Sequence, residues 1–157
     1  MNPLQKKERP SKSEPFWRRK NLAEMTEEEW EAVCDGCGRC CLHKLEDKET
    51  GEISYTGIAC RLLDIDRCRC RDYSNRTAEE NVCLTMTPRN IDAFPWLPKT
   101  CGYRLLFEGK ELPSWHPLVT GDPESVHKAG ISLRNKAVSE AFIDTEDLRP
   151  FIIDIDF

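Results

Sequence analysis

Four thiols fall within one octet of the chain, Cys34-Asp35-Gly36-Cys37-Gly38-Arg39-Cys40-Cys41. Cysteines with two residues between them, and glycines among those residues, let a short loop turn several sulfurs toward one centre. Tetrahedral zinc and iron–sulfur clusters both require such convergence. Because Cys40 and Cys41 are adjacent, their side chains diverge, and at least one of them is expected to serve a second metal, another cluster edge or redox chemistry. The octet therefore predicts metal binding, with two centres or one larger cluster.

The number of cysteines and the absence of targeting signals indicate the compartment. Nine of the 157 residues are cysteine, an odd number and a smaller share than the roughly 8–10% of small secreted scaffolds. The first residues lack the apolar segment of a signal peptide, and no apolar run approaches the roughly 20 residues of a membrane-spanning helix. We therefore expect a cytoplasmic protein without a membrane segment, whose clustered cysteines bind metal. A redox dithiol system is the alternative.

Composition predicts one domain preceded by a tail. Charged residues make up 32% of the chain and hydrophobic residues 39%, as in soluble globular proteins, and the net charge is −5. Residues 1–20 carry seven basic residues against two acidic ones. We interpret residues 1–15 as a disordered basic leader and residues 16–157 as a single cysteine-cluster domain. The leader could instead contact nucleic acid, but the overall acidity makes a dedicated nucleic-acid-binding protein an unfavoured interpretation.

A helix is predicted immediately before the octet. Thr26 and Glu29 match the two positions of a capping box, so the helix should begin near Thr26. Trp30 and Val33 would lie on its apolar side. Because a glycine inside a helix costs about 1 kcal/mol, the helix should loosen near Cys34 and restart near Arg39.

The rest of the chain reads as short elements. We expect a turn over residues 47–52, a strand from residue 53, and a hairpin of residues 59–64 and 68–73 that returns Cys68 and Cys70 toward Cys60. Two short helices are predicted over residues 88–94 and 123–129, and a terminal strand near residue 153. The predicted fold class is small, irregular α+β, with short helices and a minor β-hairpin around a cysteine metal centre.

The order of the cysteine segments is similar to that of a known family. The octet is followed by Cys60-Arg61-Leu62-Leu63-Asp64, then Cys70-Arg71-Asp72-Tyr73, then Cys83. With these motifs the chain resembles the bacterial CxxCxxCC family of zinc- or iron-chelating domains. Segments 16–17, 42–45, 96–98, 100–105 and 115–118 look like the YcgN branch of that family. The resemblance covers nearly the whole chain after the leader and implies metal chelation without assigning a reaction.

This sequence differs from the family pattern in two respects, which limit the residue roles that the resemblance implies. Other members tend to have Arg-Pro shortly before the last core cysteine, whereas here Arg76 precedes Thr77 and the gap from Tyr73 to Cys83 is longer. The role of Cys83 is therefore less secure than that of the octet. Flagellin lysine methylases share the cysteine signature, but this chain has no glycine-rich nucleotide fingerprint that would hold a methyl donor.

All nine cysteines are candidate metal ligands. The octet supplies four of them, and the resemblance assigns three more to the remaining cysteine positions of the family. The last two, Cys68 and Cys101, could equally be small buried apolar side chains. The candidate ligands are Cys34, Cys37, Cys40, Cys41, Cys60, Cys68, Cys70, Cys83 and Cys101.

Other polar residues receive secondary roles. His43 could complete a mixed Cys/His site, although a hydrogen-bonded structural role is favoured. His116 is expected to pack or cap, His127 to face outward, and neither to be catalytic. The arginines between the later cysteines could offset thiolate charge or, alternatively, contact phosphates. They are Arg61, Arg67, Arg69, Arg71 and Arg76.

Three functional hypotheses follow. The first is a cytoplasmic metal-binding protein that holds an iron–sulfur cluster or zinc, with no reaction assigned. The second is an iron–sulfur oxidoreductase or a cluster-dependent protein-modifying enzyme, and the third is a zinc-stabilised module that binds a protein partner. The spacing Cys-x-x-Cys-x-x-Cys favours iron–sulfur over zinc, because structural zinc more often uses two separate Cys-x-x-Cys pairs.

Overall fold

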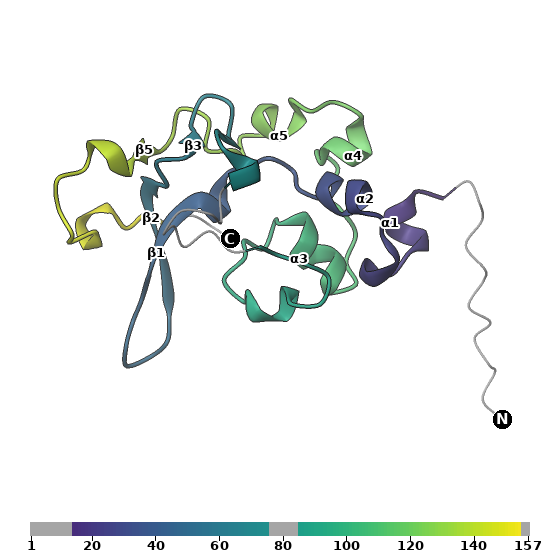
Figure 1. The fold of residues 1–157 in the computed structure, drawn as a ribbon, viewed down its shortest axis with the longest axis horizontal. Coiled ribbons are helices and arrows are strands. Elements are labelled where there is room, and N and C mark those ends of the chain that lie inside the picture. The colour runs from purple at the N-terminus through teal and green to yellow at the C-terminus, as the bar shows by residue number, and fades with distance from the viewer. Residues whose placement is uncertain (1–13, 76–84, 155–157) are drawn as a thin grey trace.

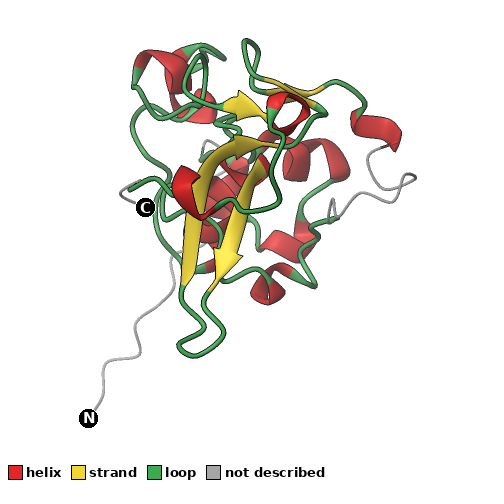
Figure 2. Cartoon of the chain, turned by 90° about the vertical axis from the view of Figure 1, so that its left-hand side faces the viewer, coloured by secondary structure: helices red, strands yellow, loops and turns green. Residues whose placement is uncertain are grey.

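The computed structural model describes residues 14–75 and 85–154 and has a small, irregular α+β fold, as predicted (Figures 1 and 2). Most of the predicted leader and Cys83 therefore lie outside the described residues. The α-helices are α1 (Phe16–Arg19), α2 (Glu27–Ala32), α3 (Gly102–Phe107), α4 (Pro117–Thr120) and α5 (Ser125–Lys128). The strands are β1 (Leu42–Glu46), β2 (Ile53–Ala59), β3 (Leu63–Asp64), β4 (Arg69–Cys70) and β5 (Val138–Ser139). Short 3₁₀ helices span Leu22–Glu24, Arg39–Cys41, Tyr73–Asn75, Ile91–Ala93, Glu140–Phe142 and Arg149–Phe151.

The strands form two small sheets. In the larger sheet, β2 lies between β1, with which it pairs antiparallel, and β5, with which it pairs parallel. The loop joining β1 and β2 projects from the body, as Figure 2 shows, and it closes with the predicted turn in which Asp47 N donates to Glu52 O. The smaller sheet is the hairpin of β3 and β4. Beyond Arg149–Phe151 the chain bridges β2 through Thr56 and Ile152, in partial agreement with the predicted terminal strand.

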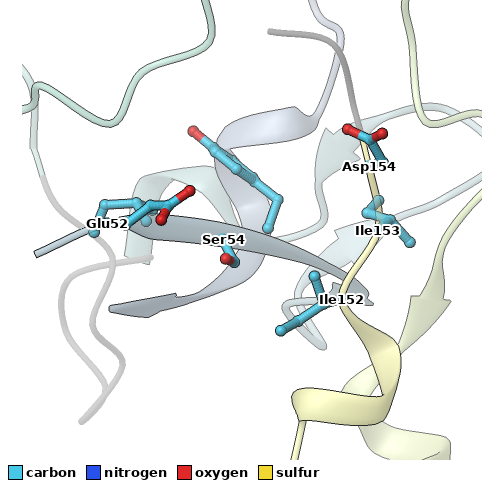
Figure 3. Close-up of a pocket in the computed structure, with 7 residues that line it drawn as sticks. Glu52, Ser54, Ile152, Ile153 and Asp154 are labelled. Carbon is cyan, nitrogen blue, oxygen red and sulfur yellow. The ribbon is translucent and has the colours of Figure 1, made fainter. Parts of the chain in front are cut away.

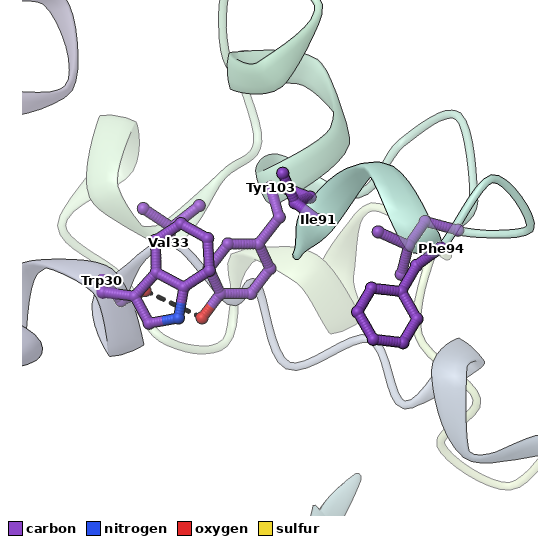
Figure 4. Close-up of a cluster of buried hydrophobic side chains, with 6 residues drawn as sticks. Trp30, Val33, Ile91, Phe94 and Tyr103 are labelled. Atoms are coloured by element: carbon purple, nitrogen blue, oxygen red, sulfur yellow. Dashed lines mark hydrogen bonds between the residues drawn. The ribbon is translucent and has the colours of Figure 1, made fainter. Parts of the chain in front are cut away.

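Two small hydrophobic cores lie on either side of the octet. The helical core consists of buried side chains from α2, α3 and the segment between them, namely Trp30, Val33, Ile91, Phe94, Leu97 and Tyr103 (Figure 4). The sheet core consists of Leu42, Tyr55, Ala59, Leu63, Cys68 and Leu133. Val33 immediately precedes the octet and Leu42 immediately follows it. The octet is therefore the direct covalent link between the two cores.

Helix α2 forms as predicted. Glu29 N donates to Thr26 Oγ1 at 3.2 Å and Thr26 N donates to Glu29 Oε2 at 2.9 Å, which completes the capping box. The helix ends at Ala32, and the chain returns to a 3₁₀ turn only at Arg39. Gly36 and Gly38 lie between these points with φ of 78° and 77°, a left-handed conformation that glycine adopts without strain.

The other predicted elements are shorter than expected. The hairpin begins at Leu63 because Cys60 lies in a turn, where its carbonyl accepts from Leu63 N at 2.9 Å. The predicted helix over residues 88–94 shrinks to Ile91–Ala93, since Asn90 has a non-helical φ of −119° and its side chain accepts from Thr87 N. Helix α5 starts two residues later than predicted. No helix within residues 14–75 and 85–154 is long and apolar enough to cross a membrane.

Helix α3 was not predicted, and it docks closely on the end of α2. Tyr103 Oη donates to Trp30 O at 2.8 Å, and the rings of these two residues lie 4.5 Å apart (Figure 4). The Nε2 of fully buried His116 lies 2.9 Å from Val33 O. Tyr103 therefore adds a second donor to Trp30 O, which also accepts from Val33 N at 3.1 Å, and His116 supplies a partner for Val33 O at the end of the helix.

Gly102 permits this close approach. A Cβ at this position would lie 2.5 Å from Val33 O and 3.0 Å from His116 Nε2, which is closer than carbon atoms pack. We expect Gly102→Ala to lower the free energy of unfolding by about 1–3 kcal/mol, as overpacking of a well-packed interior does. Chemical denaturation of the purified protein measures this change.

The control is Gly57→Ala on β2, where a Cβ would meet only an ordinary contact of 3.6 Å to Ile153 Cγ2. This variant should unfold within about 1 kcal/mol of the wild type. Equal unfolding free energies for the two variants would contradict the inference that Gly102 is needed for the close approach of α3 to Val33 O.

Candidate metal centre

The octet loop is held from both sides by backbone hydrogen bonds. Asp35 Oδ1 accepts from Cys37 N at 2.9 Å, which closes a turn around Gly36. Cys37 O accepts from Leu133 N at 2.9 Å, and Arg39 Nε donates to Ile131 O at 2.8 Å. The distant segment 131–133 therefore anchors the middle of the octet, and Cys37 is buried as a result.

Cys101 is brought to the octet by the docking of α3. It is the residue immediately before α3, and Gly102 next to it packs against Val33 O. Val33 in turn precedes Cys34. A cysteine about sixty residues away in sequence thereby joins the start of the octet. Sequence reasoning left Cys101 undecided, and the Cys101-Gly102 pair was its one available signal.

Four thiols influence one another electrostatically, namely Cys34, Cys37, Cys40 and Cys101, which we call the thiol quartet. Burial raises the pKa of Cys37 well above its usual range and that of Cys101 to about 12. The pKa of Cys34 is also raised, because dense protein surrounds this thiol although part of the residue reaches solvent. The charge of Cys40 raises all three pKa values further. A positive ion would relieve this cost of ionising neighbouring thiols.

Backbone amides near three of these sulfurs favour the thiolate form. The amides of Gly36 and Arg39 lower the pKa of Cys34 and Cys37 respectively. Those of Arg104 and Tyr103, in the first turn of α3, do the same for Cys101. Amides directed at sulfur are one of the means by which proteins stabilise thiolate ligands and tune a metal.

Cys40 differs from the other members of the quartet. Its pKa is lowered to about 7, first by a side-chain hydrogen bond with Cys41 and then by the charge of Lys44, against the effect of burial. Lys44 Nζ donates to Cys40 O at 2.9 Å and to Leu42 O at 2.8 Å, and it lies 4.2 Å from the centre of the Trp96 ring. This ammonium group is therefore a fixed positive charge beside Cys40 and Cys41.

The role predicted for the arginines between the later cysteines, offsetting thiolate charge, stays a prediction. Arg61, Arg67, Arg69 and Arg71 are exposed on the surface around the β3–β4 hairpin, and Arg76 is outside the described residues. Lys44, which sequence reasoning missed, acts on Cys40 and Cys41 of the octet. Its position two residues into the strand that follows the octet is the signal that could have identified it.

The remaining cysteines divide into two environments. Cys41 and Cys60 are cross-strand neighbours, since Cys60 N donates to Cys41 O at 2.9 Å next to the Leu42–Ala59 pair. Cys70 lies on β4, partly buried, opposite Leu63. Cys68 is buried in the sheet core with a φ of 53°, so it does not share a regular strand face with Cys70.

Cys68 packs against the octet from behind. Its Sγ lies 3.6 Å from Ile65 O and would lie 3.7 Å from a Cβ placed on Gly38. Among the eight cysteines in the part of the chain that the structure describes, none forms a disulfide. Within residues 14–75 and 85–154, no three Cys, His, Asp or Glu side chains are already positioned to hold one metal ion. Binding by the quartet would therefore require its side chains to rotate between staggered rotamers.

One buried polar atom tests whether the loop suits a cation. The Oδ2 atom of Asp35 is buried and has no hydrogen-bond partner among the described residues. A buried carboxylate oxygen without a partner is costly, so most such atoms in proteins bind a proton donor or a metal. The residues present therefore fit a metal ion.

The histidines have structural partners. His43 Nε2 lies 2.5 Å from Glu140 Oε2, which confirms the hydrogen-bonded role favoured from sequence. His116 Nδ1 accepts from Leu118 N at 3.0 Å and caps α4, so its Nε2 carries the proton shared with Val33 O. His127 is half-buried rather than outward-facing, with its Nδ1 2.7 Å from Ser132 Oγ.

A separate hollow lies at the edge of β2. It has a volume of about 340 Å³, and Figure 3 shows Glu52 and Ser54 of the β2 side facing Ile152, Ile153 and Asp154 of the C-terminal segment. Its lining is acidic and aliphatic, unlike the thiol quartet.

Comparison with known proteins identifies the cysteine region. The family model CxxCxxCC, described as "Putative zinc- or iron-chelating domain", matches residues 33–102, a range that contains all nine cysteines. A UPF0260 protein of Allorhizobium ampelinum is 55% identical over 142 residues, covering 90% of this chain and 89% of the relative. A UPF0260 protein of Caulobacter vibrioides is 57% identical (88% and 86% covered), and one of Azotobacter vinelandii is 53% identical (91% and 96%). No solved structure matches the chain.

The hydrogen bond from Tyr103 Oη to Trp30 O fixes α3 on the end of α2, and its contribution to stability can be tested. Tyr103→Phe removes the side-chain donor to Trp30 O, which keeps only its backbone bond from Val33 N at 3.1 Å, so it should lower the free energy of unfolding by about 1–1.5 kcal/mol. Tyr73→Phe is the matched control, because Tyr73 donates to Glu31 on the exposed surface. Denaturant titration should show a loss of at most about 1 kcal/mol for the control, and equal losses would refute the special role of Tyr103.

Proposed function

Since the chain belongs to the UPF0260 family and contains a CxxCxxCC domain, we propose that it binds zinc or an iron–sulfur cluster through thiols gathered by the octet. The observation that carries this proposal is the docking of Gly102 on Val33 O, which brings Cys101 to the start of the octet, where the charges of the two cysteine segments act on one another. When bound, the metal would supply positive charge to thiolates and covalent links between the two cores. No reaction is proposed.

We propose the quartet as the main ligand group. The neighbours Cys41 and Cys60, together with Cys70, would form a second group, and Cys83 would complete one of the two groups. The remaining cysteine, Cys68, is proposed as a packing residue, because its side chain is buried in the sheet core behind Gly38. In this division, the side-chain hydrogen bond between Cys40 and Cys41 would be exchanged for bonds to metal.

The choice between iron–sulfur and zinc is proposed from the sequence spacing. The spacing Cys-x-x-Cys-x-x-Cys within the octet favours an iron–sulfur cluster, with zinc as the second candidate. We also propose a cytoplasmic location, because an odd number of closely clustered cysteines is typical of metal binding in reducing compartments. The oxidoreductase and partner-binding hypotheses, and the expectation of no nucleic-acid partner, stay predictions.

The metal should supply much of the folding free energy, because each of the two cores is small. Cys37→Ser should reduce the metal bound per chain by at least half and lower the midpoint of thermal unfolding. Elemental analysis and an ultraviolet–visible spectrum of anaerobically purified protein measure the metal, and dithionite bleaching of a visible band distinguishes an iron–sulfur cluster from zinc. Removing metal from the wild type with a chelator should lower the unfolding midpoint similarly.

Cys68→Ser is the matched control, since it makes the same atomic change at a buried cysteine of the sheet core. It should destabilise the protein modestly but retain its metal. Unchanged metal content and unchanged thermal stability in Cys37→Ser would overturn the proposed function.

A further inference from the structure

The Asp35 carboxylate has one satisfied oxygen and one unsatisfied oxygen. Oδ1 accepts from Cys37 N at 2.9 Å, whereas Oδ2 is buried and has no hydrogen-bond partner in the described part of the chain. The residue as a whole is only 6% exposed. Hydrogen bonding within the loop therefore accounts for half of this carboxylate and leaves the other half unexplained.

The position of Asp35 relates it to the thiols rather than to the surface. It lies between Cys34 and Cys37 in the turn that Gly36 forms, and its Oδ1 bond holds the carboxylate against the backbone of Cys37. Its negative charge acts on all four members of the thiol quartet. For Cys34, Cys37 and Cys101, it is the largest charge effect.

Charge balance favours a coordinated Asp35 carboxylate over an uncoordinated one beside the metal. Four thiolates around one Zn²⁺ are formally −2, and an uncoordinated carboxylate beside them would make the site −3. Lys44 and the buried guanidinium of Arg39, which belongs to the same octet, would together reduce that charge to −1. If the carboxylate replaces one thiolate as a ligand and the displaced cysteine is a neutral thiol, the site carries −2, the two cations neutralise it, and Oδ2 gains the partner that it lacks.

We propose that Asp35 Oδ2 is a ligand of the metal in this centre, so that the ion is bound by a mixed set of thiolates and one carboxylate oxygen. This inference rests on the proposed function and adds an oxygen donor to it. Oxygen ligands occur at zinc sites beside sulfur and nitrogen, and they are harder donors than thiolates. The octet would then contribute Asp35 as well as cysteines.

The test uses the zinc-loaded full-length chain. X-ray absorption at the zinc edge should show an oxygen at about 2.0–2.2 Å beside sulfurs at about 2.3 Å. Asp35→Asn keeps an Oδ1 acceptor for Cys37 N but removes the anionic oxygen, so its zinc affinity should fall at least about tenfold in competition with a chelator. Asp64→Asn is the matched control, because Asp64 Oδ1 accepts from Asp66 N and Arg67 N in the hairpin turn. Its zinc affinity should equal that of the wild type.

The outcomes separate this inference from the proposed function. A wild-type spectrum with sulfur alone, or an Asp35→Asn variant with unchanged affinity, overturns the role of Asp35 while metal binding stands. A wild type and an Asp64→Asn control that bind neither zinc nor iron overturn the proposed function, and the inference with it. Should Asp35→Asn fail to fold, the wild type decides: four sulfurs refute the role of Asp35, and an oxygen at bonding distance supports it if the carboxylate infrared bands of the wild type also shift when zinc binds, since a bound water gives the same distance.

Discussion

The arrangement of the thiols depends on how the C-terminal end of α2 is closed. That helix stops immediately before the octet, and two carbonyl groups at its end accept hydrogen bonds from distant side chains: Trp30 O from Tyr103, in addition to Val33 N, and Val33 O from His116. Gly102 leaves room for this approach. The same contact that completes the helix therefore places Cys101 beside Cys34. The docking of α3 on α2 therefore both packs the helical core and brings Cys101 to the octet.

The domain is built as two small cores joined by a loop rich in thiols. Neither core is large, and the octet between them contains two glycines with left-handed backbone conformations and little apolar surface. Backbone bonds from segment 131–133 restrain this loop but do not fill it. A metal bound by the quartet would connect α2, the octet and α3.

The thiols also differ in pKa, because their surroundings differ. Cys37 and Cys101 are desolvated and resist ionisation, while Cys40 is stabilised as a thiolate by Cys41 and Lys44. The Lys44 ammonium group keeps its position through two carbonyls and the Trp96 ring. Charge is thus graded across the group, with the positive side at Lys44 and the negative side at Asp35.

Local sequence determined the features whose causes lie within a few residues. The capping box at Thr26, the end of α2 before the glycines, the turn before β2 and the β3–β4 hairpin all follow from short-range backbone chemistry, and the octet indicated metal binding without any fold. Tertiary structure alone decided which cysteines gather, because the approach of Cys101 depends on contacts made some seventy to eighty residues apart in sequence. It also placed the Lys44 ammonium group beside Cys40 and buried one oxygen of Asp35. The positions of Cys101, Lys44 and Asp35 depend on how the two cores pack against the octet, and no local sequence pattern determines that packing.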